Sequence, residues 1–207
     1  MIKQIAQNVW QFYFNNLGSN CYLTKSAGKN ILIDTSGEEN RQELTSDLSK
    51  MHANPEKIDI VLITHLHYDH IGNIELFENA KIYASKEELN DFKKKPFEAV
   101  LNENFIEKIV DGISKTQPTQ EFIKIGKIKI EPIENFELKS VRIIKVPGHT
   151  HGSIAFYMPK EKILFSGDTL FDEGIGRTDL PTSMPEKMKD SLRKLKKIDY
   201  EILCAGH

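Results

Sequence analysis

The sequence contains very little cysteine and no long apolar run. Its 207 residues include only two cysteines, Cys21 and Cys204, each inside a short apolar segment. This number excludes a disulfide-stapled scaffold, and we expect two buried free thiols, because cysteine packs as a small hydrophobe. No uninterrupted apolar stretch approaches the roughly 20 residues that a membrane-spanning helix needs, so the sequence predicts no membrane span.

The sequence also lacks an excess of either charge. The 28 basic and 30 acidic side chains nearly cancel and are interspersed along the chain. This balance gives no electrostatic footprint for nucleic acid and argues against a polyanionic partner. Residues 1–8 lack the apolar core and the small-residue cleavage site of a secretory signal, so we expect a cytoplasmic protein.

Strand-like and helix-like segments alternate along the chain. The length suits one domain, residues 1–207, with a full hydrophobic core. Three β-favouring runs within residues 9–34 are separated by turn-forming residues and predict an antiparallel meander. A helix is expected over residues 38–51, where apolar side chains recur at helical spacing.

The second half of the chain continues this alternation. The polar segment 85–111 favours helix and is expected to form a packing helix followed by a loop, with a helical insertion or lid near the site as the alternative. Strands resume from residue 121. Ser183, Pro185 and Glu186 form the pattern of a capping box at the start of a final helix.

Three histidines and one aspartate fall within six positions, directly after the apolar, β-branched run 58–63. This run predicts a buried strand, and His65, His67, Asp69 and His70 follow it. If the chain stays extended from His65 to His67, both imidazoles lie on the same side and can share one metal ion. Asp69 and His70 cannot join that face, so a turn would direct them to a second position. Burial of four such groups without a metal would be costly, and the spacing therefore predicts two metal ions.

Three further ligand-type residues follow predicted strands. His149, Asp168 and His207 each lie beside a glycine at the end of a β-favouring run, and Asp168 has two oxygens that can reach two ions. His52 follows a predicted helix and is expected to face solvent. His151 is expected either to line the pocket or to be structural.

The segment His65–His70, followed in order by His149, Asp168 and His207, resembles the metallo-β-lactamase superfamily, and the resemblance covers essentially the whole chain. It implies an α/β (α+β) fold, a four-layer αββα sandwich of two mixed sheets flanked by helices, with the metal ions in a cleft along one edge. It also implies the ligands: His65, His67 and His149 for the first ion, Asp69, His70 and His207 for the second, and Asp168 between them.

The loop after Asp168 resembles one branch of this superfamily in particular. Residues 165–171 and 174–181 look like those of the hydroxyacylglutathione hydrolases (glyoxalase II) and their relatives. This resemblance implies a hydrolase in which two zinc ions hold a bridging hydroxide that attacks a thioester or related ester of a small molecule. Asp69 and Asp168 would be the catalytic carboxylates.

Two more carboxylates are expected to support the site. Asp34 ends a predicted strand and is a candidate partner for orienting a metal ligand. Asp179 can pair with Arg177 and hold the loop in shape. Hydroxyacylglutathione hydrolases continue past the last metal histidine into a helical region that helps to bind glutathione, whereas the printed sequence ends at His207. The motifs therefore predict a thioester hydrolase without predicting glutathione.

The same residues are compatible with two other functions. Persulfide dioxygenases are similar to this chain in the same loops and bind one iron ion through two histidines and an aspartate, which by resemblance would be His65, His149 and Asp168. The alternative metal content is therefore one iron ion, or a mixture of zinc, iron and manganese. A non-catalytic metal-binding protein is the third reading, although such proteins tend to lose ligands and this chain has all seven.

Overall fold

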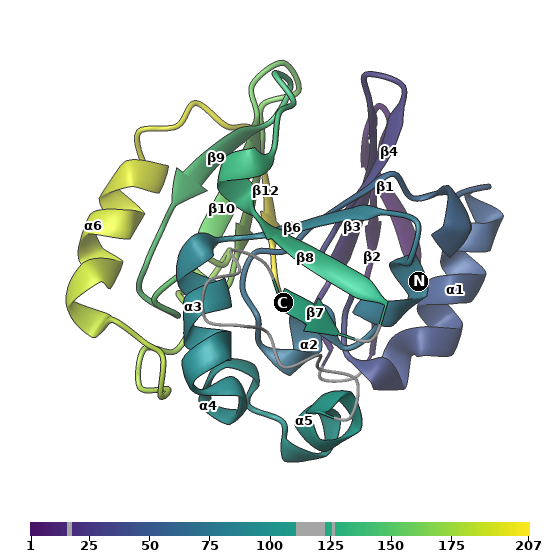
Figure 1. The fold of residues 1–207 in the computed structure, drawn as a ribbon. Helices are drawn as coiled ribbons and strands as arrows, with labels where there is room; N and C mark the ends of the chain where they lie inside the picture. The colour runs from purple at the N-terminus through teal and green to yellow at the C-terminus, as the bar shows by residue number, and fades with distance from the viewer. Residues whose placement is uncertain (16–17, 111–122, 126) are drawn as a thin grey trace.

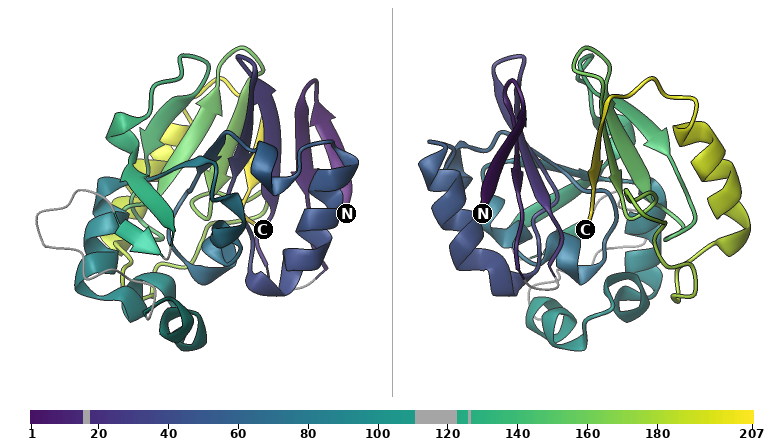
Figure 2. Two further views of the ribbon diagram at one scale, coloured as in Figure 1. Left: turned by 45° about the vertical axis from the view of Figure 1, so that its right-hand side comes forward. Right: turned by 180° about the vertical axis from the view of Figure 1, so that it is seen from behind.

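Two mixed β-sheets face each other, and helices cover their outer faces (Figure 1). The structure is a computed structural model that describes residues 1–15, 18–110, 123–125 and 127–207. Figure 2 shows the layers: helix α1 (Arg41–Lys50) lies outside the first sheet, and helix α6 (Pro185–Leu195) lies outside the second. This arrangement confirms the αββα sandwich that the resemblance implied.

The first sheet contains eight strands of the described chain, in the order β1-β2-β3-β4-β5-β6-β8-β7. Their bounds are β1 Ile2–Ala6, β2 Val9–Phe12, β3 Cys21–Ser26, β4 Lys29–Ile33, β5 Ile60–Leu62, β6 Lys81–Ala84, β7 Ile123–Ile125 and β8 Ile128–Pro132. The first four strands pair antiparallel, as the predicted meander requires, although the sequence patterns do not predict β1. Strands β4 and β5 run parallel, so both end at the same edge and place Asp34 beside the histidine-rich segment.

The second sheet contains four strands, as far as the chain is described, in the order β12-β11-β10-β9. They are β9 Arg142–Lys145, β10 Ile154–Met158, β11 Ile163–Gly167 and β12 Ile202–Ala205. Strands β10 and β11 form an antiparallel hairpin, whereas β11 and β12 run parallel. Because β9 is antiparallel to β10, strands β9, β11 and β12 all point the same way. The residues that follow them therefore reach one edge of the sheet.

Short helices lie in the lower part of Figure 1, near the edge where these strands end. They are α2 Tyr68–Ile71, α3 Lys86–Lys94, α4 Pro96–Val100 and α5 Glu103–Val110. The predicted helical segment 85–111 contains three helices, with breaks at Lys95 and at residues 101–102, and residue 111 lies outside the described residues. Leu89 and Phe92 of α3 pack into the core, as the packing interpretation expects, but two further helices follow where a loop was expected. Among the described helices, none has both the length and the apolar composition that crossing a bilayer requires.

Helix α6 begins without the predicted capping box. Its N-cap is Met184, whose side chain makes no capping hydrogen bond, and Pro185 is the first helical residue. The Ser183 hydroxyl instead donates to the carbonyl of His149 at 2.7 Å and accepts from the amide of Leu180 at 3.2 Å. The prediction was wrong because the serine stabilises the loop that carries His149 rather than the helix start.

Three hydrophobic clusters fill the spaces between the layers. Leu44 and Leu48 of α1 pack against the outer face of the first sheet. The inner face of that sheet packs against Phe156 and Phe165 of the second sheet, and Leu195 of α6 covers the outer face of the second. Successive residues of β3 and β4 alternate between the first two clusters, because side chains along a strand point to opposite faces.

Both cysteines are buried free thiols, as the sequence predicts. Cys21 packs in the cluster under α1, and Cys204 packs between the sheets. Burial raises the pKa of each thiol above its ordinary value. The reactive thiolate is therefore scarce at neutral pH, and both side chains act as core residues.

Phe156→Ala is expected to destabilise the protein by about 3–5 kcal/mol, because it removes a fully buried ring from between the sheets and leaves a cavity. Phe97→Ala is the matched control, since Phe97 is 48% exposed and its loss should change stability by less than about 0.5 kcal/mol. Urea unfolding followed by circular dichroism measures both values. Equal losses in the two variants would contradict the assignment of the core.

Candidate metal centre

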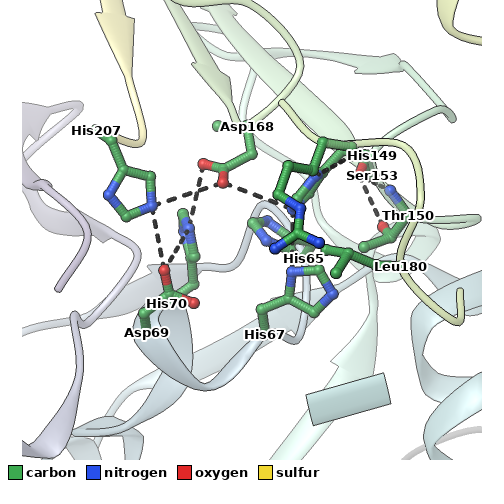
Figure 3. Close-up of polar contacts among 12 residues, drawn as sticks. His65, His67, Asp69, His70, His149, Thr150, Ser153, Asp168, Leu180 and His207 are labelled. Carbon is green, nitrogen blue, oxygen red and sulfur yellow. Dashed lines mark hydrogen bonds and ion pairs between the residues drawn. The ribbon is translucent and has the colours of Figure 1, made fainter. Parts of the chain in front are cut away.

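Seven ligand-type side chains meet where the strands of both sheets end (Figure 3). The segment after β5 of the first sheet contributes His65, His67, Asp69 and His70. The second sheet contributes His149, Asp168 and His207, which follow β9, β11 and β12. The structure thus brings together every residue that the sequence analysis assigned as a metal ligand.

Among the described residues, three groups of side chains have ligand atoms within 4.8 Å of one another. The first group is buried and consists of His65, His67 and His149, whose ring centroids lie 4.6, 4.7 and 4.8 Å apart. The second group is more open to solvent and consists of Asp69, His70 and His207. The third group shares one residue with each of the others and consists of His65, His70 and Asp168.

The carboxylate of Asp168 lies between the first two groups, as Figure 3 shows. Its Oδ1 is 3.3 Å from His70 Nε2, and its Oδ2 is 3.5 Å from His149 Nε2 and 3.6 Å from His207 Nε2. Gly206 leaves room for this carboxylate, because a Cβ atom there would lie 2.0 Å from Asp168 Oδ1. One carboxylate therefore faces histidines of both groups, which is the arrangement that a bridging ligand needs.

Four buried polar atoms of this cluster lack a hydrogen-bond partner in the described chain: His65 Nε2, His67 Nε2, His70 Nε2 and Asp168 Oδ1. A buried polar atom without a partner costs about 1–3 kcal/mol, so such atoms are rare unless something else satisfies them. All four side chains belong to the groups whose ligand atoms converge. Imidazole nitrogens with carboxylate oxygens form a donor set that suits zinc and iron, and the residues therefore fit a metal centre.

Asp34 fixes the orientation of His70. Its carboxylate accepts hydrogen bonds from His70 Nδ1 through Oδ2 and from the amide of Thr64 through Oδ1, each 2.8 Å long. The Thr64 hydroxyl donates to Oδ2 at 2.8 Å as well. Because Nδ1 of His70 donates to Asp34, Nε2 is the ring nitrogen that faces Asp168, as expected for a histidine oriented toward a metal.

A short helix, rather than the predicted turn, redirects the chain after His67. Helix α2 begins at Tyr68 with His67 in an extended conformation at its N-cap, so Asp69 and His70 both lie on the helix. The amide and hydroxyl of Thr35 donate to the carbonyl of His70 at 2.7 and 3.0 Å. The change from extended chain to helix is what separates the first group from the second.

His207 is held by residues of the first sheet. The amide of Asn20 donates to the carbonyl of Gly206 at 2.7 Å, and the Tyr22 hydroxyl donates to the carbonyl of Ala205 at 2.7 Å. The amide of Gly206 also donates to the carbonyl of Gly167 in β11 at 3.0 Å. Sequence reasoning missed Asn20 and Tyr22, because no local pattern links them to residues more than 180 positions away.

The loop after Asp168 fixes His149. His149 Nδ1 donates to the carbonyl of Arg177 at 2.8 Å, which directs Nε2 toward the cluster. The guanidinium of Arg177 donates two hydrogen bonds of 3.0 Å to Asp179, so the predicted loop-shaping pair is present. His151 lies outside the three groups and pairs with Asp91 at 3.0 Å, which corresponds to the structural interpretation.

Electrostatics divide the histidines into two kinds. Burial lowers the pKa of His65, His67 and His149, to about 3 for His67, so these rings are neutral and can bind a metal. Burial opposes the charge of His70 too, but the carboxylates of Asp34, Asp168 and Asp69 outweigh it and raise the pKa of His70 well above its usual value. Burial also opposes ionisation of Asp69 and Asp168, yet His70 beside them lowers the pKa of both carboxyl groups.

An open cleft of about 570 Å³ leads to the cluster. Its floor includes His67, Asp69, His149 and Asp168. One wall is apolar and consists of Val100 and Leu101, at the end of α4, with Leu180 from the opposite loop, while Glu39, Tyr68 and Arg177 add polar atoms. The cleft is large enough for a small molecule to reach the ligand-type side chains.

Comparison with known proteins identifies the family. Residues 15–207 match the sequence model of the metallo-beta-lactamase superfamily. The chain belongs to this superfamily. It is 34% identical over 194 residues to a hydroxyacylglutathione hydrolase of Haemophilus influenzae, a match that covers 91% of this chain and 84% of that protein. It is also 32% identical over 188 residues to a probable metallo-hydrolase of Methanocaldococcus jannaschii, covering 88% and 82% of the two chains.

Solved structures of the superfamily share the fold. The crystal structure of TTHA1623 in a di-iron-bound form matches 95% of this chain and 91% of its own, with a TM-score of 0.70 and 25% sequence identity. These comparisons confirm the predicted superfamily and fold, and the relatives named above are hydrolases by name.

The metal-free protein is expected to lose stability as the pH falls below about 6.5, because the unfolded chain then binds protons that the buried imidazoles of the folded chain do not bind. Between the ordinary value of 6.5 and the folded pKa of about 3, His67 alone should lower the free energy of unfolding by about 1.4 kcal/mol per pH unit. Urea unfolding with a chelator present, at about pH 7 and about pH 5, measures this loss.

His67→Gln should weaken this pH dependence, since it removes one group that the unfolded chain protonates first. His52→Gln is the control, because His52 is exposed and belongs to none of the three groups found in the described chain. A pH dependence that is the same in wild type, His67→Gln and His52→Gln would contradict the burial of a neutral imidazole at position 67.

Proposed function

We propose that this chain is a metal-dependent hydrolase that holds two zinc ions and cleaves a thioester or related ester of a small molecule. The observation that carries the proposal is the presence of two ligand groups with Asp168 between them. A relative named hydroxyacylglutathione hydrolase supports the thioester chemistry. A similar structure in a di-iron-bound form supports a centre of two ions and makes iron the alternative metal.

The two groups give the proposed ligand assignment. His65, His67 and His149 would hold the first ion, Asp69, His70 and His207 the second, and Asp168 would bridge them. When bound, two divalent ions supply Lewis acidity and lower the pKa of water to about 7, which makes a nucleophile available at neutral pH.

The protein contributes proton acceptors and orientation. Asp69 lines the cleft, its side chain is 31% exposed, and its lowered pKa keeps it ionised at neutral pH. The ionised carboxylate can orient a water molecule at the floor of the cleft or accept its proton. Asp34 and the carbonyl of Arg177 hold His70 and His149 through their Nδ1 atoms, so both rings keep Nε2 directed at the centre.

The residues of the cleft wall indicate the chemistry of the substrate portion that does not react. Val100, Leu101 and Leu180 are apolar, and the charge of Arg177 is already paired with Asp179. This wall favours a substrate whose acyl or thiol portion is uncharged near the reacting carbonyl. It supports a thioester without requiring glutathione.

Metal analysis coupled to a substrate panel tests the function. We expect two zinc ions per chain and hydrolysis of a thioester, lost on chelation and restored by zinc, because both ligand groups must be filled. The panel also includes a lactone, a phosphodiester and a persulfide. Stoichiometric iron with oxygen uptake on the persulfide would replace the hydrolase with a persulfide dioxygenase. Bound metal without turnover of any substrate would indicate a non-catalytic metal-binding protein.

Asp69→Asn is expected to lower kcat by about 10²–10⁴-fold on the best substrate, because it removes the proposed proton acceptor. Asp190→Asn is the control, since Asp190 lies on the exposed face of α6 and pairs with Arg193. Metal content measured on the same samples separates loss of the second ion from loss of the proton acceptor. An Asp69→Asn enzyme as active as the control would rule out this role.

A further inference from the structure

Glu88 is a buried carboxylate that the proposed reaction does not use. It lies on α3, its exposed fraction is 2%, and it belongs to none of the three ligand groups found among the described residues. Burial raises the pKa of its carboxyl, although hydrogen bonds from Thr150, Leu66 and Gly152 counteract this effect. A buried carboxylate needs a compensating set of donors, and those donors show what Glu88 holds together.

All the hydrogen bonds of the Glu88 carboxylate go to the two segments that carry the first ligand group. Its Oε2 accepts from the amide of Leu66 at 2.8 Å, and Leu66 stands between His65 and His67. Its Oε1 accepts from the hydroxyl of Thr150 at 2.6 Å and from the amide of Gly152 at 3.0 Å, directly after His149. One carboxylate thus connects the His65–His67 segment of the first sheet with the His149 segment of the second.

The packing around this carboxylate is close. A Cβ atom at Gly152 would lie 2.5 Å from the amide nitrogen of Glu88 and 2.4 Å from the hydroxyl of Ser85. Ser85 caps α3 by accepting from the amide of Glu88, so the start of the helix is fixed against the loop. The hydroxyls of Thr150 and Ser153 lie 2.7 Å apart and brace the same loop (Figure 3).

We propose that Glu88 is a positioning residue for the three-histidine group, setting the separation of His149 from His65 and His67. The inference rests on the proposed function, in which these three side chains hold one metal ion. Asp34 orients the other group through His70, so each group has its own buried carboxylate. This separation of roles predicts that loss of Glu88 weakens the binding of the ion at the three-histidine group and leaves the binding of the other ion unchanged.

Glu88→Gln is the sharpest test, because glutamine keeps the shape but has only one acceptor oxygen. In either orientation its amide NH₂ group faces a backbone N–H, that of Leu66 or that of Gly152, and one donor loses its partner. Glu87→Gln is the matched control, since Glu87 is in the same helix turn, is about one-third exposed and pairs with Lys145.

Chelator competition with zinc, and with cobalt as a coloured substitute, measures the affinity of each ion. We expect Glu88→Gln to weaken the binding of one of the two ions by about 10- to 100-fold and to change the cobalt absorption of that site alone. Glu87→Gln should match wild type in both. A wild-type protein that binds no metal would overturn the proposed function itself, whereas two tight ions in Glu88→Gln would overturn this inference alone.

Thr150→Val provides a second route if Glu88→Gln does not fold. It removes one of the three hydrogen bonds to the Glu88 carboxylate, together with the contact to the Ser153 hydroxyl, and retains a β-branched side chain of similar size. We expect a smaller, severalfold loss of affinity at the same ion, with Thr150→Ser close to wild type because it keeps the hydroxyl. Wild-type affinity in Thr150→Val would overturn the inference.

Discussion

The structure depends on one constraint. Imidazoles and carboxylates are gathered at one edge of the sheets with their metal-ligating atoms directed at one another, rather than at hydrogen-bonding groups elsewhere in the protein. Such an arrangement persists only if each side chain is fixed through its other atoms. His70 is fixed by Asp34 and His149 by the carbonyl of Arg177. Glu88 fixes the backbone between the first two histidines. The loops, glycines and short helices at this edge can be understood as supports for that geometry.

The sheet topology supplies the convergence that these supports refine. Parallel neighbours end at one edge, so β4 and β5 bring Asp34 to the histidine-rich segment, and β11 and β12 bring Asp168 to His207. The two sheets then meet at the start of β3, where Asn20, just before the strand, and Tyr22, within it, hold the chain just before His207. The apolar contact between the inner faces, centred on Phe156 and Phe165, therefore sets how closely the two halves of the centre approach.

The sequence was informative where spacing along the chain carries the chemistry. Ligand-type residues at strand ends could be recognised one by one, and the resemblance that they carry implied the architecture. Contacts between distant segments could not be predicted, because Glu88, Asn20 and Tyr22 act through amides and carbonyls that any residue provides. The capping box failed for the same reason: Ser183 has a local pattern, but the His149 carbonyl is a tertiary partner for its hydroxyl. Helix α2 replaced the expected turn because four residues suffice for one helical turn.

The two ligand groups differ in exposure, and this difference gives the proposed reaction a direction. The three-histidine group is buried, whereas the side chains of Asp69 and His207 are 31% and 38% exposed. In the proposed reaction, water and substrate would enter the cleft past Asp69 and the apolar residues that end at Leu101. Leu101 has a φ of 62°, a left-handed conformation that a leucine adopts at some cost in energy. The strain lies where α4 ends at the cleft, so the turn that places this wall over the exposed side of the centre is held by the surrounding structure rather than by local preference.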